Sequence, residues 1–278
     1  MFNTRSIMDD EVSQVSCFSK FTGKFSKRGA KSESCTPVEI IEPVTMELYI
    51  KAGPEDGQVG DCPFAHYVRG VMSFKGLDCK VIPCKPETKP EWLLNDPDLK
   101  GKMPCLKKDD FKLVSFHLTC YLCFAKNNFL WQVESGAISE FIEKTHPDPP
   151  LVIENVEKAT EVQSAFFPAM AKLVKSTKPQ ADLEKAFLEQ AKKLNDHLES
   201  EKTKYFAGDV PSLIDFSLAP KLYHMDVTLA EFHPKVHEKV VKMKALKAYM
   251  DLMFGHEAFQ KTLYPKETIL WGWSAARK

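Results

Sequence analysis

The proline-rich cluster His146-Pro147-Asp148-Pro149-Pro150 divides this chain into two parts with different hydrophobic patterns. Proline lacks a backbone donor and interrupts helices and central strands, so the cluster predicts a linker. Before it, short apolar segments separated by turns predict alternating strands and helices. Beyond it the apolar spacing is helical throughout. The sequence therefore predicts an α/β first part, residues 46–150, followed by an all-helical second part, residues 151–278.

The α/β part begins with the pattern of a βαβ unit. Met46 to Ala52 alternates apolar and polar side chains, which predicts a half-buried strand that ends at the Gly53-Pro54-Glu55-Asp56-Gly57 turn. A helix starting at Pro63 follows, and Cys79 to Cys84 predicts a second strand. The helix is expected to bury an apolar face made of Phe64, Val68, Val71 and Met72.

Further strand and helix signals complete both parts. Cys105 to Lys107 and Phe111 to Leu113 lie on either side of an Asp109-Asp110 turn and predict a hairpin. In the second part, Ser212 and Asp215 before an apolar run predict a helix N-cap. Another amphipathic helix is indicated by the helical spacing of Leu183, Phe187, Ala191, Leu194 and Leu198.

Cys62 stands where the first helix is predicted to start, with Pro63 at the first helical position. The free N–H groups and the positive end of the helix dipole would point at its sulfur. Such a setting lowers a cysteine pKa from about 8.5 to roughly 3.5–7.5. Position 65 is alanine, so no Cys-x-x-Cys partner exists. The pattern predicts a nucleophilic thiolate, with a buried structural cysteine as the alternative.

Composition narrows the classes of partner. The chain has 38 basic and 38 acidic residues, which gives no global attraction to nucleic acid or anionic membranes, and favours a small-molecule partner. Eight cysteines without a secretory signal are typical of reduced thiols in an intracellular protein. The most apolar stretch, Val114 to Trp131, is too polar for a membrane span. Cys120 and Cys123 alone are too few ligands for structural zinc, so no metal is expected.

The first 45 residues have no strong periodicity and leave two alternatives open. Between Val12 and Ser32 they are rich in Ser, Lys, Arg and Phe and lack acids, as in an organelle transit peptide. Asp9, Asp10 and Glu11 depart from that pattern. Residues 1–45 are therefore either a plastid transit peptide or a disordered tail, which makes plastid or cytosol the expected location.

Five motifs carry a resemblance to a known family: Gly60-Asp61-Cys62-Pro63-Phe64, Lys89-Pro90-Glu91-Trp92, Gly101-Lys102-Met103-Pro104, the proline-rich cluster with Leu151, and Asp215 to His224. Over residues 46–278 the chain resembles the glutathione transferase superfamily, and within it the dehydroascorbate reductases of plants and algae. The resemblance implies a thioredoxin-like, glutathione-binding domain (46–150) and an all-helical domain (151–278). It further implies a monomer that binds no cofactor and uses glutathione as co-substrate.

The same resemblance assigns glutathione-binding residues. Met103-Pro104 would hold glutathione through its backbone around a cis-proline, which is a rare geometry. Glu134-Ser135 would bind the γ-glutamyl group at a helix N-terminus, where N–H donors face a carboxylate. Lys102 would lie beside them, with a solvated charge as the alternative reading.

The resemblance also implies the reaction and two residues beside the thiol. Cys62 would reduce dehydroascorbate, become oxidised, and be restored by two glutathione molecules through a mixed disulfide. Lys51 would stabilise the thiolate and Asp61 would orient substrate hydroxyls. The alternatives are an exposed lysine at a strand end and an aspartate that caps the helix. Two other functions stay open: an omega-like thioltransferase, and a channel-like protein of this fold without turnover.

Residues 114–132 depart from the family pattern. They separate a predicted strand from its helix and are expected to form a hydrophobic loop next to the glutathione pocket, where loops are ordinarily polar. The codons of Val114-Ser115 can read GTAAGT and that of Gln132 can read CAG, which are the borders of an intron. The segment is therefore either a genuine insertion or a retained intron.

Overall fold

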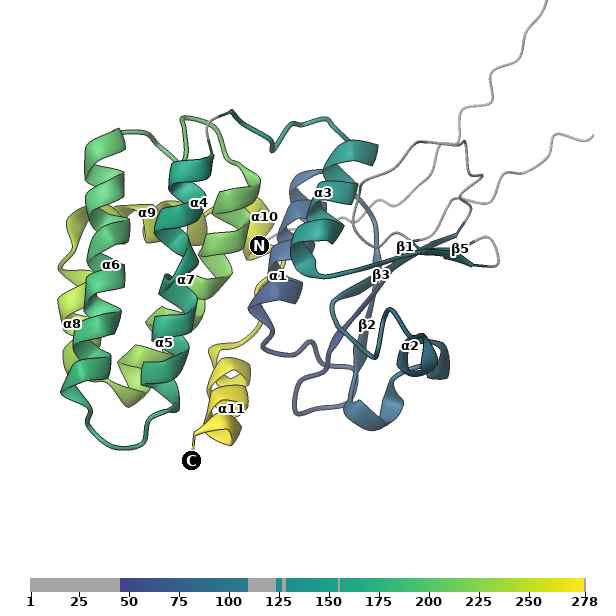
Figure 1. Ribbon diagram of the computed structural model, residues 1–278, viewed down its shortest axis with the longest axis horizontal. Helices are drawn as coiled ribbons and strands as arrows, with labels where there is room; N and C mark the ends of the chain where they lie inside the picture. The colour runs from purple at the N-terminus through teal and green to yellow at the C-terminus, as the bar shows by residue number, and fades with distance from the viewer. Residues whose placement is uncertain (1–45, 110–123, 127–128, 155, 278) are drawn as a thin grey trace, which may run out of the picture. The chain divides into compact units, whose positions relative to one another are not determined.

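The computed structural model describes residues 46–109, 124–126, 129–154 and 156–277. The predicted tail or transit peptide and the predicted strand at 111–113 lie outside these residues. In the α/β part the described strands form one sheet in the order β2-β1-β3-β5-β4 (Figure 1). The elements are β1 (Met46–Lys51), α1 (Pro63–Phe74), β2 (Lys80–Cys84), a short 3₁₀ turn (Pro86–Thr88), α2 (Glu91–Asn95), β3 (Cys105–Asp109), β4 (Phe124–Lys126), β5 (Phe129–Val133) and α3 (Ser135–Thr145).

The predicted βαβ unit is confirmed: β1 and β2 are parallel and α1 connects them. The expectation for β1 holds except at Tyr49: on the face expected to be polar, Glu47 is half-buried and Lys51 is exposed, but Tyr49 is buried. Leu48 and Ile50 pack in a core with α1 and α3, whereas Tyr49 packs on the opposite face with Leu93 of α2. The side chains of β1 therefore contribute to two cores, one on each face of the sheet.

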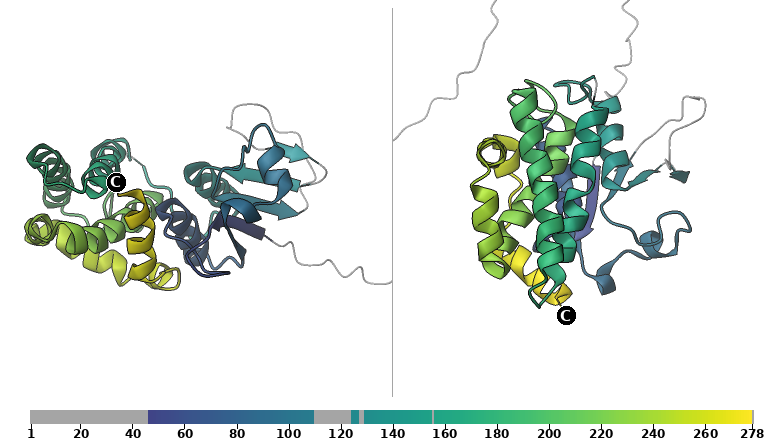
Figure 2. Two further views of the ribbon diagram at one scale, coloured as in Figure 1. Left: turned by 90° about the horizontal axis from the view of Figure 1, so that it is seen from below. Right: turned by 60° about the vertical axis from the view of Figure 1, so that its left-hand side comes forward.

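Helix α1 begins as predicted, with Cys62 as N-cap residue and Pro63 at the first position. Val68 and Val71 are fully buried, but Phe64, expected on the same face, is 42% exposed. Phe64 lies in the first turn, where its ring meets Phe167 edge to face instead of entering the core. The helix packs against α7, and α1 and α3 lie between the sheet and the helices of the second part (Figure 2).

The hairpin partner of β3 differs from the expectation. β3 pairs antiparallel with β5, in a register that runs from Cys105 opposite Val133 to Asp109 opposite Phe129. Most of β5 and all of β4 fall inside the segment expected to be a loop, residues 114–132. A strand was missed there because its backbone hydrogen bonds come from β3, which the local sequence pattern does not reveal.

The second part is helical, as predicted. Its elements are α4 (Glu157–Ser164), α5 (Phe166–Lys175), α6 (Ala181–Glu201), α7 (Leu213–Phe232), α8 (Pro234–Val241), α9 (Lys244–Phe254), α10 (Glu257–Gln260) and α11 (Lys266–Ala276). The predicted capping box is present: the Ser212 backbone N–H donates to Asp215, whose carboxylate is fully buried at the start of α7.

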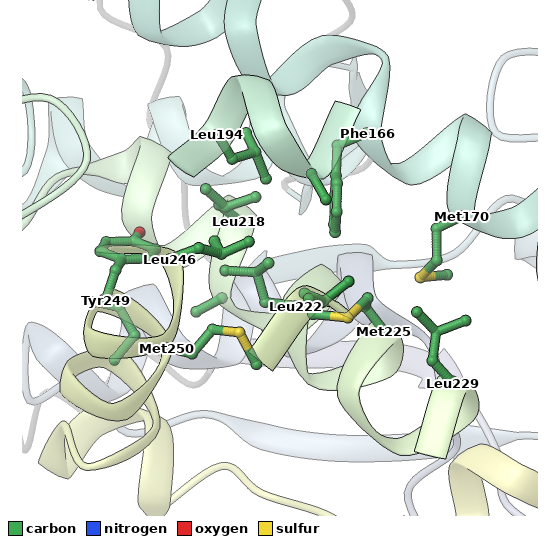
Figure 3. Close-up of a cluster of buried hydrophobic side chains, with 14 of the residues drawn as sticks. Phe166, Met170, Leu194, Leu218, Leu222, Met225, Leu229, Leu246, Tyr249 and Met250 are labelled. Atoms are coloured by element: carbon green, nitrogen blue, oxygen red, sulfur yellow. The ribbon is translucent and has the colours of Figure 1, made fainter. Parts of the chain in front are cut away.

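The helices enclose a core contributed by α5, α6, α7 and α9 (Figure 3). Each large apolar side chain buried there contributes about 1.5–3 kcal/mol relative to exposure. Helix α7 has apolar residues around much of its circumference, which is typical of a helix buried on several sides. The labelled side chains of this core are Phe166, Met170, Leu194, Leu218, Leu222, Met225, Leu229, Leu246, Tyr249 and Met250.

A buried ion pair holds the proline-rich linker. The Lys75 ammonium lies 2.6 Å from Glu143 and donates to the carbonyls of His146 and Pro149. The Glu143 carboxylate also accepts from the backbone N–H of Leu151. The end of α1 and the end of α3 thus fix the path of the chain into the helical part. Within the described residues, no helix is both long and apolar enough to cross a bilayer.

Candidate active site

Cys62 lies half-buried at the N-terminus of α1, with an extended backbone (φ −75°, ψ 112°). The backbone N–H groups of Phe64 and Ala65 face its sulfur and lower the pKa of the thiol, but burial raises it by more. The expectation that the pKa of Cys62 is lowered is therefore wrong. The helix N-terminus is present as predicted, but desolvation of the sulfur outweighs it.

The other described cysteines lie in strands or directly before one. Cys84 and Cys105 are buried and Cys79 is half-buried, and all three are free thiols. Burial raises the pKa of Cys79 and of Cys105 to about 12. Neither has a helix N-terminus directed at its sulfur. Cys84 and Cys105 are small core residues, whereas Cys79 packs only partly against the core.

A pocket of about 390 Å³ opens beside the first turn of α1. Residues from separate segments of the chain line it, including every residue that the sequence assigned to glutathione. The Met103–Pro104 peptide bond is cis, as expected. The pocket is lined by Phe64, Lys102, Met103, Pro104, Glu134, Ser135 and Gly136.

The N-terminus of α3 forms one wall of this pocket. Ser135 is its first residue, so the first-turn N–H groups have no partner within the helix and are available to an anion. Glu134 has a positive φ of 74°, a rare conformation for a residue other than glycine that costs about 1–3 kcal/mol. Its carboxylate pairs with Lys102 at 2.9 Å across the pocket.

A second group of residues lies on the other side of Cys62. Lys51, at the end of β1, donates to Asp61 at 2.6 Å. Asp61 is buried, while the Lys51 side chain is 46% exposed. The Lys51 ammonium also lies 5.5 Å from the centre of the Trp271 ring, a cation–π contact. Gly272 allows α11 to lie directly against Asp61, because a Cβ at position 272 would be 1.9 Å from the Asp61 carboxylate.

Behind Asp61 and Cys62, buried aromatic groups form a hydrogen-bonded chain. The Trp273 indole N–H donates to Nδ1 of His224 at 2.9 Å, and Nε2 of His224 lies 2.8 Å from the Tyr264 hydroxyl. Burial lowers the pKa of His224 to about 3, so its imidazole is neutral. The three residues connect α7, α11 and the segment between α10 and α11.

In the sequence His224 was only the last residue of a family motif, with no role assigned to it. No sequence pattern indicated that Tyr264, Trp271, Gly272 or Trp273 would lie near the thiol. The contacts of these residues span 40 or more positions in the chain, beyond the range of a local pattern. Among the residues that the structure describes, no group of three or more His, Cys, Asp or Glu side chains is placed to hold a metal ion.

Comparison with known proteins places this geometry in context. The "Glutathione S-transferase, N-terminal domain" family model matches residues 58–150, and the "Glutathione S-transferase, C-terminal domain" model matches residues 177–252. A relative from Oryza sativa subsp. japonica, "Probable glutathione S-transferase DHAR1, cytosolic", is 30% identical over 233 residues, covering 82% of this chain and 97% of the relative.

Two further comparisons agree with these. "Glutathione S-transferase DHAR3, chloroplastic" from Arabidopsis thaliana is 28% identical over 272 residues, 97% of this chain and 94% of the relative. Among solved structures, dehydroascorbate reductase from Chlamydomonas reinhardtii superposes with a TM-score of 0.65 at 26% identity, covering 84% of this chain and 98% of that one. The expected thioredoxin-like domain followed by a helical domain is confirmed.

Proposed function

Because the chain belongs to the glutathione transferase family, we propose that it catalyses the glutathione-dependent reduction of dehydroascorbate to ascorbate through the thiolate of Cys62. The observation that carries this proposal is the pocket beside α1. Lys102, Met103, Pro104, Glu134 and Ser135, which the resemblance assigns to glutathione, come from two distant segments of the chain, and all of them line it.

The proposed reaction balances in three steps. The Cys62 thiolate attacks an electron-poor carbonyl of dehydroascorbate; two electrons pass to the substrate, water supplies the oxygen, and ascorbate leaves with Cys62 as sulfenic acid. One glutathione then forms a mixed disulfide with Cys62 and releases water. A second glutathione attacks that disulfide, yields glutathione disulfide and restores the thiol. Ala65 supports this route, because it leaves no neighbouring thiol to compete with glutathione.

Each side of the thiol has a role in this scheme. The free N–H groups of α3 at Ser135 receive the γ-glutamyl carboxylate, and the backbone of Met103 receives the glutathione main chain. On the other side, Lys51 lowers the pKa of the Cys62 thiol, while the nearby Asp61 carboxylate raises it. Of the two, the Asp61 carboxylate has the larger effect on the Cys62 pKa. The salt bridge between them also offers a cation and an acceptor to a small hydroxylated ring.

The assay that tests the proposal is glutathione-dependent formation of ascorbate by the full chain. Cys62→Ser is expected to abolish turnover, and the matched control Cys79→Ser is expected to retain it. Asp61→Ala should lower dehydroascorbate turnover about tenfold or more, equivalent to roughly 1.4 kcal/mol of transition-state stabilisation. Its activity on a small mixed disulfide should fall much less. An active Cys62→Ser variant would overturn the assignment, and equal losses on both substrates would favour a thioltransferase.

We further propose that the protein acts as a monomer in the plastid or the cytosol. One relative is named chloroplastic and another cytosolic. Size-exclusion chromatography with light scattering tests the first point, with about twice the chain mass as the contradicting result. Fractionation of the source cells tests the second.

A further inference from the structure

A second pocket, of about 340 Å³, lies at the opposite end of α1 from Cys62. It opens where the end of α1, the start of β2 and the segment after α10 meet, and α1 packs against α10 there. It shares no lining residue with the pocket assigned to glutathione. Its lining includes Arg69, Met72, Leu77, Asp78, Val81 and Lys261.

Arg69 brings to this pocket a charge that no acidic side chain balances. One of its guanidinium N–H groups donates to the backbone carbonyl of Thr262 at 2.9 Å. Among the residues that the structure describes, no carboxylate forms an ion pair with Arg69. Burial lowers the pKa of Arg69, because its side chain is partly removed from water. Arginine nevertheless keeps its charge in proteins, so the guanidinium is a partly desolvated cation with N–H donors left for a further acceptor.

Two other charged side chains of the lining limit the charge of a ligand. Lys261 is exposed and already pairs with Glu257 at 2.7 Å, so its charge is largely offset. Asp78 is exposed, so water screens its charge more than it screens that of Arg69. Asp78 still repels a ligand that carries a second negative charge. These charges favour a monoanion over a dianion such as phosphate.

The remaining part of the lining that bears on the ligand is apolar. Met72 is buried, and Leu77 and Val81 are half-buried against the core of the α/β part. A planar guanidinium can donate two parallel N–H groups to one carboxylate. A guanidinium beside apolar side chains therefore suits a carboxylate that is attached to an apolar body.

We propose that this pocket binds small amphipathic monocarboxylates, with the carboxylate on the guanidinium of Arg69 and the apolar body against Met72 and Leu77. The Thr262 carbonyl already holds the guanidinium, so little side-chain entropy is lost when the ligand binds. The inference goes beyond the proposed function and does not rest on it, because no residue of the Cys62 site takes part.

The experiment titrates para-fluorobenzoate into the full chain and follows its binding by fluorine NMR. The neutral analogue para-fluorobenzyl alcohol measures the contribution of the charge, and inorganic phosphate is added as a competitor. We expect the carboxylate to bind at least about tenfold more tightly than the alcohol, and phosphate to compete only weakly. Saturating glutathione should not displace the probe. Equal affinity for the alcohol, strong competition by phosphate, or displacement by glutathione would overturn the inference.

Arg69→Gln removes the charge and keeps an N–H donor for the Thr262 carbonyl, so it should weaken binding of para-fluorobenzoate about tenfold or more. The matched control is Arg277→Gln. Its guanidinium also donates to a backbone carbonyl, that of Val174, but it does not line this pocket. The control should keep the wild-type affinity, and an equal loss in both variants would contradict the proposal.

A second variant guards against misfolding of the first. Ser73 is half-buried in the lining, so Ser73→Trp should fill the pocket and abolish binding while Arg69 stays in place. Wild-type affinity in either folded variant overturns the inference. Cys62→Ser should bind the probe as the wild type does. Binding in a chain without reductase activity would leave this inference standing, whereas an active reductase that does not bind the probe would refute this inference alone.

Discussion

At the scale of single residues, Cys62 is subject to opposing effects on its ionisation. The N-terminus of α1 directs N–H groups at the sulfur, and burial removes the water that would solvate the anion. Desolvation is the larger effect, so the thiol needs further donors or cations to ionise near neutral pH. Lys51 is one such group. The site therefore depends on contacts outside the Cys-Pro turn.

Gly272 is a residue on which these contacts depend. An added Cβ would lie 1.9 Å from the Asp61 carboxylate, so Gly272→Ala must displace α11 or turn Asp61 away from Lys51. We expect dehydroascorbate turnover to fall tenfold or more, as for Asp61→Ala. Gly208→Ala is the control, because its added Cβ would meet Ile153 at an ordinary 3.6 Å. Steady-state kinetics of both variants checks this, and wild-type turnover in Gly272→Ala would contradict it.

Residue-level prediction from the sequence succeeded where the signal was local. Cys62 and Pro63 are adjacent and carry their own helix-start signal. Phe64 was assigned to the buried face because its spacing fits, but a first-turn residue can extend past the elements that cover the rest of the helix. Tyr264 and Trp273 were missed because their partner, His224, is 40 and 49 positions away. The pKa of Cys62 was misjudged because burial by distant helices is not a property of the motif.

At the scale of elements, the register between β3 and β5 bears on the segment 114–132. In this register Val133 pairs with Cys105 and the next pairs follow without a bulge. Removing the segment would join Leu113 directly to Val133. The residues that would then face Leu106, Lys107 and Lys108 of β3 are, in order, Leu113, Lys112 and Phe111. Asp109-Asp110 would be left as a two-residue turn, a common hairpin length.

We therefore predict that a chain lacking residues 114–132 keeps the Val133–Cys105 pair and with it the position of Glu134-Ser135. Its reductase activity should equal or exceed that of the full chain. Loop length by itself costs only about 0.6 kcal/mol per doubling, so any gain should come from removing apolar groups next to the pocket. Turnover and thermal melting of the two chains provide the measurement. An unfolded or inactive shortened chain would show that β4 and β5 are needed.

The ion pair between α1 and α3 supports a separate prediction. Lys75→Met leaves the Glu143 carboxylate buried without its cation, and breaking such a pair costs about 3–5 kcal/mol. The free energy of unfolding, from urea denaturation, should fall by that amount. Lys247→Met removes a pair exposed on α9 and is the control, with a near-neutral effect expected. Equal effects in the two variants would mean that the linker does not depend on Lys75.

At the scale of the whole molecule, buried neutral histidines join the two parts. His66 of the α/β part contacts Thr262 of the helical part, and His224 of α7 lies behind the Asp61-Cys62 turn. Burial lowers the pKa of His224 to about 3 and that of His66 well below its ordinary value. Protonation of either residue would place an unpaired charge between the parts.

These histidines make the protein sensitive to acid. As pH falls below about 6.5, the unfolded chain binds a proton at each site and the folded chain does not, so the free energy of unfolding falls. The slope is up to about 1.4 kcal/mol per pH unit for each histidine. Urea denaturation between pH 6 and pH 5 measures it, and His66→Gln should reduce the slope. Stability that is constant across this window would contradict the assignment.

The architecture of the whole chain was predictable because its signals repeat along each element. The proline-rich cluster and the change from strand to helix pattern gave the division into an α/β part and a helical part, and the family models match on both sides of it. The docking of α11 over Asp61 was not predictable. It depends on Gly272, which has no side chain to clash with Asp61. Asp61 is far from Gly272 in the sequence, so no pattern around Gly272 reveals this contact.

The central claim is that Cys62 alone transfers two electrons to dehydroascorbate before glutathione reacts, and a single-turnover experiment tests it most directly. The full chain, freed of glutathione, is mixed with excess dehydroascorbate, and ascorbate is counted while a sulfenic acid probe maps the oxidised cysteine. We expect one ascorbate per chain, the probe on Cys62, and further turnover only after glutathione is added. No ascorbate before glutathione, or the probe on another cysteine, would contradict it.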